Sequence, residues 1–220
     1  MATDLSASSR HAGELAALLA HASDACLSFM HVVSGSALDG LRRLLGAQAN
    51  IEEGLLKAAR HELHELASPI AQHHGLQIEE LIVSGAVVEE IVAAAQRAVA
   101  DLVVVGAHSA ESVAERLLGS TTARLLRTAR CPVIVSKRER PEPYRRVLVP
   151  VDFSPWTAAA IKLASEVAPG AHLVLMHAWE LPFEGLLRRA DIDAAQVEQY
   201  KRDLENEVRG RVERVAEDHG

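Results

Sequence analysis

Asp101-Leu-Val-Val-Val-Gly-Ala-His-Ser-Ala-Glu-Ser-Val-Ala-Glu-Arg-Leu-Leu-Gly-Ser-Thr121 is the stretch that decides how the rest of the chain is interpreted. Leu102 to Val105 is typical of a strand buried in a parallel sheet, and Gly106 ends it where the backbone turns. Ser120 and Thr121 are favourable N-cap residues for the helical pattern that follows. The positive end of that helix would face the loop, so the stretch predicts either an anion-binding loop or an ordinary strand–loop–helix connection.

The segments on either side of this stretch alternate between strand and helix patterns. A parallel sheet with helices on both faces, an α/β fold, is the arrangement that such alternation predicts. Ser34 to Gly40 is rich in glycine and serine and is expected to form a turn. Strands are predicted at residues 25–33, 76–83, 102–105 and 131–136.

The end of the chain repeats part of its beginning. Asp152-Phe-Ser154 matches Asp4-Leu-Ser6, and Arg146 to Val151 supplies a strand for which we find no counterpart before Asp4. We therefore expect a first domain over residues 1–137 that lacks its first strand. A charged, proline-bearing linker would follow over 138–144, and 145–220 would form the N-terminal part of a second copy.

Composition excludes several classes of protein. The chain has 220 residues, a formal net charge of −7 and no apolar run of the about 20 residues that span a bilayer. No nucleic-acid surface and no membrane association are expected. The N-terminal residues lack a secretory signal, which favours the cytoplasm. Cys26 and Cys131 have no metal-type spacing and are expected to be buried reduced thiols.

Motifs for catalysis and metal binding are absent from the sequence. There is no Gly-x-Ser-x-Gly nucleophile motif and no Gly-x4-Gly-Lys-Ser/Thr phosphate loop. His61 and His64 have helical spacing, but no carboxylate or cysteine completes a tetrahedral metal site. We expect no catalytic residue and no metal ligand, and at most slow hydrolysis of a bound nucleotide.

Three segments carry a resemblance to the universal stress protein family. They are Val147-Leu-Val-Pro-Val-Asp-Phe-Ser154, Leu118-Gly-Ser-Thr-Thr122 and Cys131-Pro-Val-Ile-Val135. The chain resembles the family's tandem two-domain form with a truncated second domain. The resemblance implies a parallel five-stranded sheet flanked by helices, of the adenine-nucleotide alpha hydrolase-like type, and a homodimer formed through the last strand.

The resemblance also implies a nucleotide site, because some members of the family bind ATP. Mg²⁺ would then be bound together with the ATP. Asp4 would accept hydrogen bonds from the ribose or the base, although a cap on the first helix is an equally good interpretation of this residue. The backbone of Val32 would contact the adenosine. The phosphates would lie against Gly106, Ser109, Gly119, Ser120 and Thr121.

Ser109 departs from the family pattern, which has glycine at this position. Its side chain would either crowd the phosphates or donate a hydrogen bond to them. Glu111 and Glu115 add negative charge to the same loop. Two functions follow from these observations: a stress-response module that binds ATP, weakly because of Ser109, or an interaction or scaffold protein that binds no nucleotide and acts as a dimer.

Overall fold

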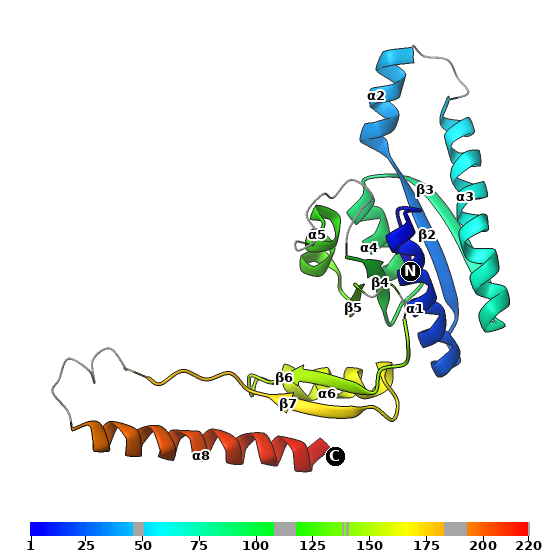
Figure 1. The fold of residues 1–220 in the computed structure, drawn as a ribbon. Helices are drawn as coiled ribbons and strands as arrows, with labels where there is room; N and C mark the ends of the chain where they lie inside the picture. Colours follow the sequence, from blue (N-terminus) through cyan, green and yellow to red (C-terminus); the bar gives the residue numbers. More distant parts are fainter. Residues whose placement is uncertain (46–50, 108–117, 138, 140, 183–192, 220) are drawn as a thin grey trace. The chain divides into compact units, whose positions relative to one another are not determined.

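The computed structural model describes residues 1–45, 51–107, 118–137, 139, 141–182 and 193–219. The chain divides into two compact units, Met1–Glu142 and Pro143–Gly220, which are described separately below. Strands and helices alternate in both units, and every strand pair is parallel (Figure 1). The predicted α/β fold with parallel sheets and flanking helices is confirmed.

The described residues of the first unit form five strands and five helices. In order these are β1 (Ala2–Thr3), α1 (Ala7–Ser23), β2 (Leu27–Ser34), α2 (Gly35–Leu45), α3 (Ile51–His74), β3 (Ile78–Gly85), α4 (Val87–Arg97), β4 (Val103–Gly106), α5 (Ser120–Thr128) and β5 (Val133–Ser136).

The strands of this unit do not form one continuous five-stranded ladder. Hydrogen bonds join β1, β2 and β3 in one sheet and β4 with β5 in another. β1 contacts β4, but its two residues are paired only with β2, through Ala2 opposite Met30 and Thr3 opposite His31. A strand this short gives β4 almost no edge with which to pair. α1 contacts both β2 and β4 and so bridges the two sheets.

The expectation that no strand precedes Asp4 was wrong. Ala2 and Thr3 form β1, and the chain extends this pairing because the amide of Met30 donates to the carbonyl oxygen of Met1 at 2.9 Å. Two residues are too few to show the period-two alternation by which a strand is found in a sequence. The strand is recognisable only through its pairing with β2.

The two faces of β2 bury alternate residues, as the geometry of a strand requires. Phe29 is fully buried on the face covered by α1 and α3. Met30 and Val32 face the opposite side, where they join a core cluster with α4 and α5. The predicted sheet with helices on both faces is thus present in the first unit.

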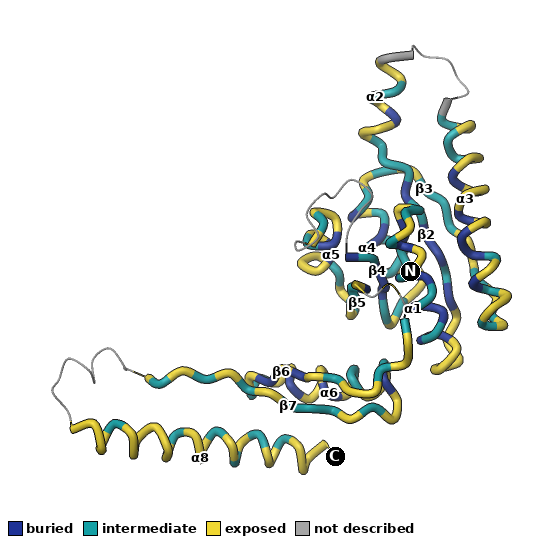
Figure 2. The backbone as a smooth tube through the Cα atoms, viewed as in Figure 1, coloured by how far each residue is buried: buried dark blue, intermediate teal, exposed yellow. Residues whose placement is uncertain are grey.

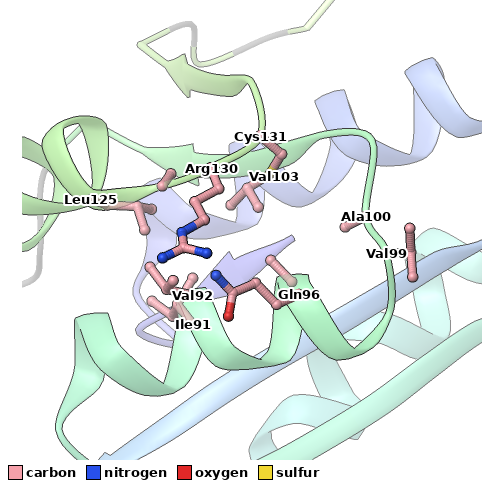
Figure 3. A pocket seen from close by; sticks show the side chains of 11 residues that line it. Ile91, Val92, Gln96, Val99, Ala100, Val103, Leu125, Arg130 and Cys131 are labelled. Carbon is pink, nitrogen blue, oxygen red and sulfur yellow. The ribbon is translucent and has the colours of Figure 1, made fainter.

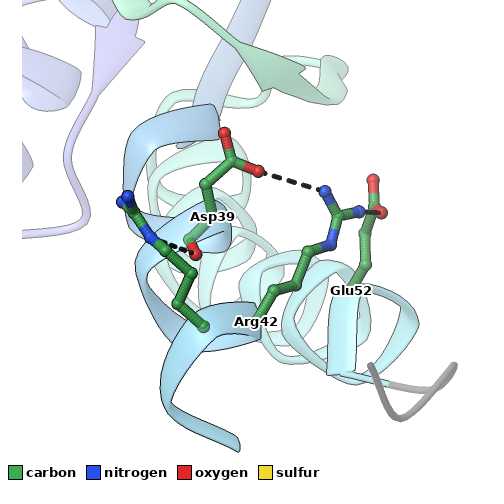
Figure 4. Close-up of polar contacts among 4 residues, drawn as sticks. Asp39, Arg42 and Glu52 are labelled. Carbon is green, nitrogen blue, oxygen red and sulfur yellow. Dashed lines mark hydrogen bonds and ion pairs between the residues drawn. The ribbon is translucent and has the colours of Figure 1, made fainter. Parts of the chain in front are cut away.

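The segment after β2 is a helix and not the predicted turn. α2 begins at Gly35, and its Leu38 is buried. The glycines and serines around Leu38 suggested a turn, although this buried side chain holds the helix against the rest of the unit. Arg42 connects α2 to α3, since its guanidinium pairs with Asp39 at 3.3 Å and with Glu52 (Figure 4). These side chains are exposed, and pairs of this kind contribute at most about 1 kcal/mol each.

The second unit contains β6 (Arg146–Pro150), α6 (Trp156–Val167), β7 (His172–Met176) and α8 (Ala194–His219). β6 pairs with β7, and Val149, Val151 and Ile161 form a small core. Val212 and Val215 of α8 pack against this core, whereas α8 buries none of its residues completely (Figure 2).

The internal repeat in the sequence coincides with repeated local geometry. Leu5 has φ 65° and Phe153 has φ 59°, each in the turn that follows the first strand of its unit. His31 Nδ1 donates to the carbonyl oxygen of Thr3 at 2.9 Å, and His177 Nδ1 donates to that of Val151 at 2.7 Å. Each histidine, on the second strand of its unit or just after it, thus donates to a residue at the carboxyl end of the first strand.

Candidate functional site

Several predicted site residues lie at the carboxyl edge of the strands of the first unit. Thr3 and His31 form the last pair of the β1–β2 ladder, so Asp4 directly follows β1. Val32 is the next residue of β2, which continues to Ser34 in its pairing with β3. Gly106 ends β4, which contacts β1. Ligands of parallel α/β sheets bind at this edge, where the strand order reverses.

Asp4 is exposed and stabilises a turn at its own position. Its Oδ1 accepts a hydrogen bond from the amide of Ser6 at 3.1 Å. The N-cap of α1 is Ser6, whose hydroxyl accepts from the amide of Ser9 at 3.2 Å. The interpretation of Asp4 as the helix cap is therefore wrong, and its carboxylate lies beside the cap at the sheet edge.

Val32 presents its side chain to the core, where it is 7% exposed. It belongs to the cluster between the sheet and α4, which also includes Val88 and Ile91. A ligand at the sheet edge would therefore reach only the backbone of Val32, in agreement with the role that the family resemblance implies for it.

The two ends of the loop between β4 and α5 are fastened to each other. The amide of Gly119 donates to the carbonyl oxygen of Ala107 at 3.0 Å, and Thr122 Oγ1 donates to that of Gly106 at 3.0 Å. Thr122 is buried, so this second bond is shielded from solvent. The start of α5 is thereby held beside the end of β4.

The N-cap of α5 is Gly119, with φ −56° and ψ 150°, and no side chain caps this end of the helix. Ser120 and Thr121, which we predicted as caps, are instead its first two helical residues and are exposed. Backbone amides at an uncapped helix N-terminus favour an anion. At the described start of α5, backbone amides are therefore left without a side-chain cap.

Residues 108–117 of the loop lie outside the part of the chain that the structure describes. They include Ser109, the predicted site residue that departs from the family pattern, and His108, Glu111 and Glu115. The effect of Ser109 on nucleotide binding thus stays a prediction. In the described ranges, no group of three or more histidine, cysteine or acidic side chains converges as a metal site would require.

Ser136 is a polar residue of this edge that the sequence did not single out. It ends β5 opposite Gly106, and its carbonyl oxygen accepts from the amide of Ala107 at 3.0 Å. Its hydroxyl is buried and has no hydrogen-bond partner among the described residues. Its position at the end of an apolar run gave no sign of this, because burial depends on the packing of distant segments.

We expect Ser136→Ala to leave stability unchanged or to raise it by up to about 1 kcal/mol. A buried hydroxyl without a partner loses its hydration and gains nothing in return, so its removal relieves a cost. Urea unfolding followed by circular dichroism measures the change. A loss of more than about 1 kcal/mol would mean that the hydroxyl has a partner in the folded protein.

The second unit has an aspartate in the same local setting as Asp4. Asp152 Oδ1 accepts from the amide of Ser154 at 2.9 Å and from the hydroxyl of Thr157 at 3.3 Å. Hydrogen bonds from Ser154, and a further one from Thr157, lower the pKa of the Asp152 carboxyl. This carboxylate stays ionised and holds the turn before α6.

A family model described as the universal stress protein family matches residues 1–137. Universal stress protein MJ0531 of Methanocaldococcus jannaschii is 33% identical over 140 residues, which cover 64% of this chain and 81% of that protein. Rv1996 of Mycobacterium tuberculosis is 34% identical over 139 residues. These residues cover 59% of this chain but only 43% of Rv1996, so the chain spans less than half of that relative.

A solved structure agrees with the fold. A universal stress protein from Archaeoglobus fulgidus superposes with a TM-score of 0.64 at 22% identity, covering 86% of this chain and 70% of that chain. A universal stress protein in complex with cAMP is 32% identical, covers 62% of this chain and 92% of that chain, and has a TM-score of 0.44. None of the helices in the described ranges has the length and apolar character to cross a membrane. With its first 137 residues matched by the family model and supported by these relatives, the chain belongs to the universal stress protein family.

Proposed function

We propose that this universal stress protein is a stress-response regulatory module that binds an adenine nucleotide at the carboxyl edge of its first unit. The observation that supports this proposal best is the fastening of the loop at both ends. Gly119 and Thr122 bind the end of β4, which places the uncapped start of α5 beside Gly106. The phosphates of a nucleotide would accept hydrogen bonds from these helix amides.

The other predicted site residues at this edge would contact the remaining groups of the nucleotide. The carboxylate of Asp4 would accept from the ribose hydroxyls, as acidic residues do in other α/β nucleotide sites. The backbone of Val32 would contact the base, and Ser120 and Thr121 would offer amides and hydroxyls to the phosphates. Mg²⁺ would be bound mainly by the phosphates of ATP and by water, since it commonly keeps several water ligands.

Titration with a fluorescent ATP analogue tests the proposal. We expect saturable binding to the parent chain, competition by ATP, and at least tenfold weaker binding in Gly119→Val. The φ and ψ of Gly119 are accessible to valine, so the variant adds a side chain at the helix start without backbone strain. cAMP, the ligand in the related crystal structure, serves as a second competitor.

Thr128→Val is the matched control, because Thr128 lies at the opposite end of α5. It should bind the analogue like the parent chain. If Ser109→Gly binds more tightly than the parent, the serine crowds the phosphates. Equal affinity in Gly119→Val and the parent, or no saturable binding in either the parent or Ser109→Gly, would refute the proposed site.

The alternative function is an interaction protein that binds no nucleotide and acts as a homodimer. The second unit favours it, because Trp156, Leu148 and Met176 are 79%, 56% and 45% exposed. Large apolar side chains exposed on a protein surface are common where proteins associate. Sedimentation equilibrium of the parent and of Trp156→Ser would show whether this surface mediates self-association.

A further inference from the structure

The first unit contains a cavity of about 250 Å³ at the edge of the sheet opposite the loop (Figure 3). It lies between the C-terminal halves of α4 and α5 and the amino ends of β4 and β5. Residues of the nucleotide site proposed above take no part in it. Its apolar lining includes Ile91, Val92, Ala95, Val103, Leu125 and Cys131.

The floor of the cavity belongs to the rigid core. Ile91, Val103 and Leu125 are buried members of the cluster that holds α4 and α5 on the sheet. The rim is formed in part by Val99, which has φ 49°, a left-handed conformation that costs a β-branched residue on the order of 1–2 kcal/mol. Two hydrogen bonds maintain this turn, from the amide of Val99 to Gln96 and from that of Ala100 to Ala95.

Two polar side chains, Arg130 and Gln96, reach the mouth of this apolar space. Figure 3 shows the guanidinium of Arg130 and the amide of Gln96 on the same side of the cavity, above Ile91 and Val92. Among the described residues, neither side chain has an ion-pair or hydrogen-bond partner. An apolar pocket with a few converging polar groups is the usual form of a small-molecule site.

We propose that this cavity binds a small carboxylic acid with an apolar tail. The tail would lie among Val92, Ala95 and Cys131, and the carboxylate would pair with Arg130 and accept from the amide of Gln96. Arginine binds carboxylates through two parallel hydrogen bonds. This pairing is stronger and more specific in geometry than that of lysine or a neutral donor. The volume, below the about 300 Å³ of the smallest drug-sized pockets, sets the size of the acid.

Binding of this acid depends on Arg130, because the other charges described near the cavity do not attract a carboxylate. The C-terminal end of α5 carries partial negative charge, and Asp101 acts electrostatically on Cys131. Burial is the main cause that raises the pKa of the Cys131 thiol, with Asp101 adding to it. The thiol therefore stays neutral, and Arg130 supplies the positive charge at the mouth.

Isothermal titration of the whole chain with hexanoate tests the proposal. We expect saturable binding with a Kd on the order of 1 mM or tighter, as suits so small a ligand. Arg130→Met keeps the apolar stem and removes the charge, and it should weaken binding at least tenfold. Arg127→Met, in the last turn of α5 just before Arg130, is the matched control, because the Arg127 side chain donates to the carbonyl oxygen of Ala123, and it should bind like the parent.

Two further measurements separate this site from weak surface binding. Hexanol has the same tail without the charge and should bind at least tenfold more weakly than hexanoate. In a Cys26→Ser background, hexanoate should slow the alkylation of Cys131 with the same midpoint as the titration. No saturable binding, equal binding of hexanol, an unchanged affinity in Arg130→Met or unprotected Cys131 would each overturn the proposal.

Discussion

Phe29→Ala is expected to lower the free energy of unfolding of the first unit by about 3–5 kcal/mol, the usual loss for a buried phenylalanine. The ring has no exposed surface and lies between β2, α1 and α3. Removing it leaves a cavity on the face of the sheet that α1 and α3 cover. Both tryptophans lie in the second unit, so hydrogen exchange of β2, together with urea unfolding followed by circular dichroism, reports on the first.

Leu126→Ala is the matched control for this truncation. Leu126 is a large apolar residue of the same unit but is 44% exposed. Its loss should cost less than about 1 kcal/mol, because substitutions of exposed residues rarely do more. Equal losses in Phe29→Ala and Leu126→Ala would show that the buried ring does not hold the two helices on the sheet.

Long apolar patterns predicted the fold well, and short or polar segments did not. The apolar pattern of α3 spans many turns, and Gly75, with φ 66°, follows its end. β1 has only two residues, and the glycines and serine at the start of α2 favoured a turn although Leu38, Leu41 and Leu45 follow helical spacing. Both are stabilised by contacts with residues far away in the sequence.

Cysteine burial was also predicted incorrectly at one position. Cys26 is exposed, whereas Cys131 is partly buried beside the cavity. Both residues stand just before a strand, and the sequence around them gave the same expectation for each. Only the packing of α4 and α5 over the second of these positions separates them.

The candidate site could be predicted in its positions but not in its details. Asp4 and Gly106 lie at one edge because parallel strands place their carboxyl ends together, and Val32 lies in the C-terminal half of β2, next to the last residue that pairs with β1. The hydrogen bonds that fasten Gly119 and Thr122, and the buried hydroxyl of Ser136, depend on how α5 and β5 pack. Packing of this kind leaves no local pattern in a sequence.

Gly13→Leu is expected to destabilise the first unit by about 3 kcal/mol, the upper end of the usual cost of overpacking. Gly13 lies on the buried face of α1. A Cβ atom added there would stand 3.1 Å from Phe29 Cζ and 3.1 Å from Ile70 Cδ1. A leucine would have to displace one of these side chains. Urea unfolding measures the loss, with Gly40→Leu as the control, because no atom lies within 4 Å of a Cβ built at Gly40.

The double variant Gly13→Leu/Phe29→Ala tests the same contact from both sides. The leucine would occupy space that the phenyl ring leaves, so each change relieves part of the damage caused by the other. Neighbouring residues couple by about 0.5–3 kcal/mol, and we expect the double variant to be more stable than the sum of the single losses by about 1–3 kcal/mol. Strict additivity would show that α1 and β2 do not meet at Gly13 and Phe29, and the close approach of helix and sheet would then have to lie elsewhere along α1.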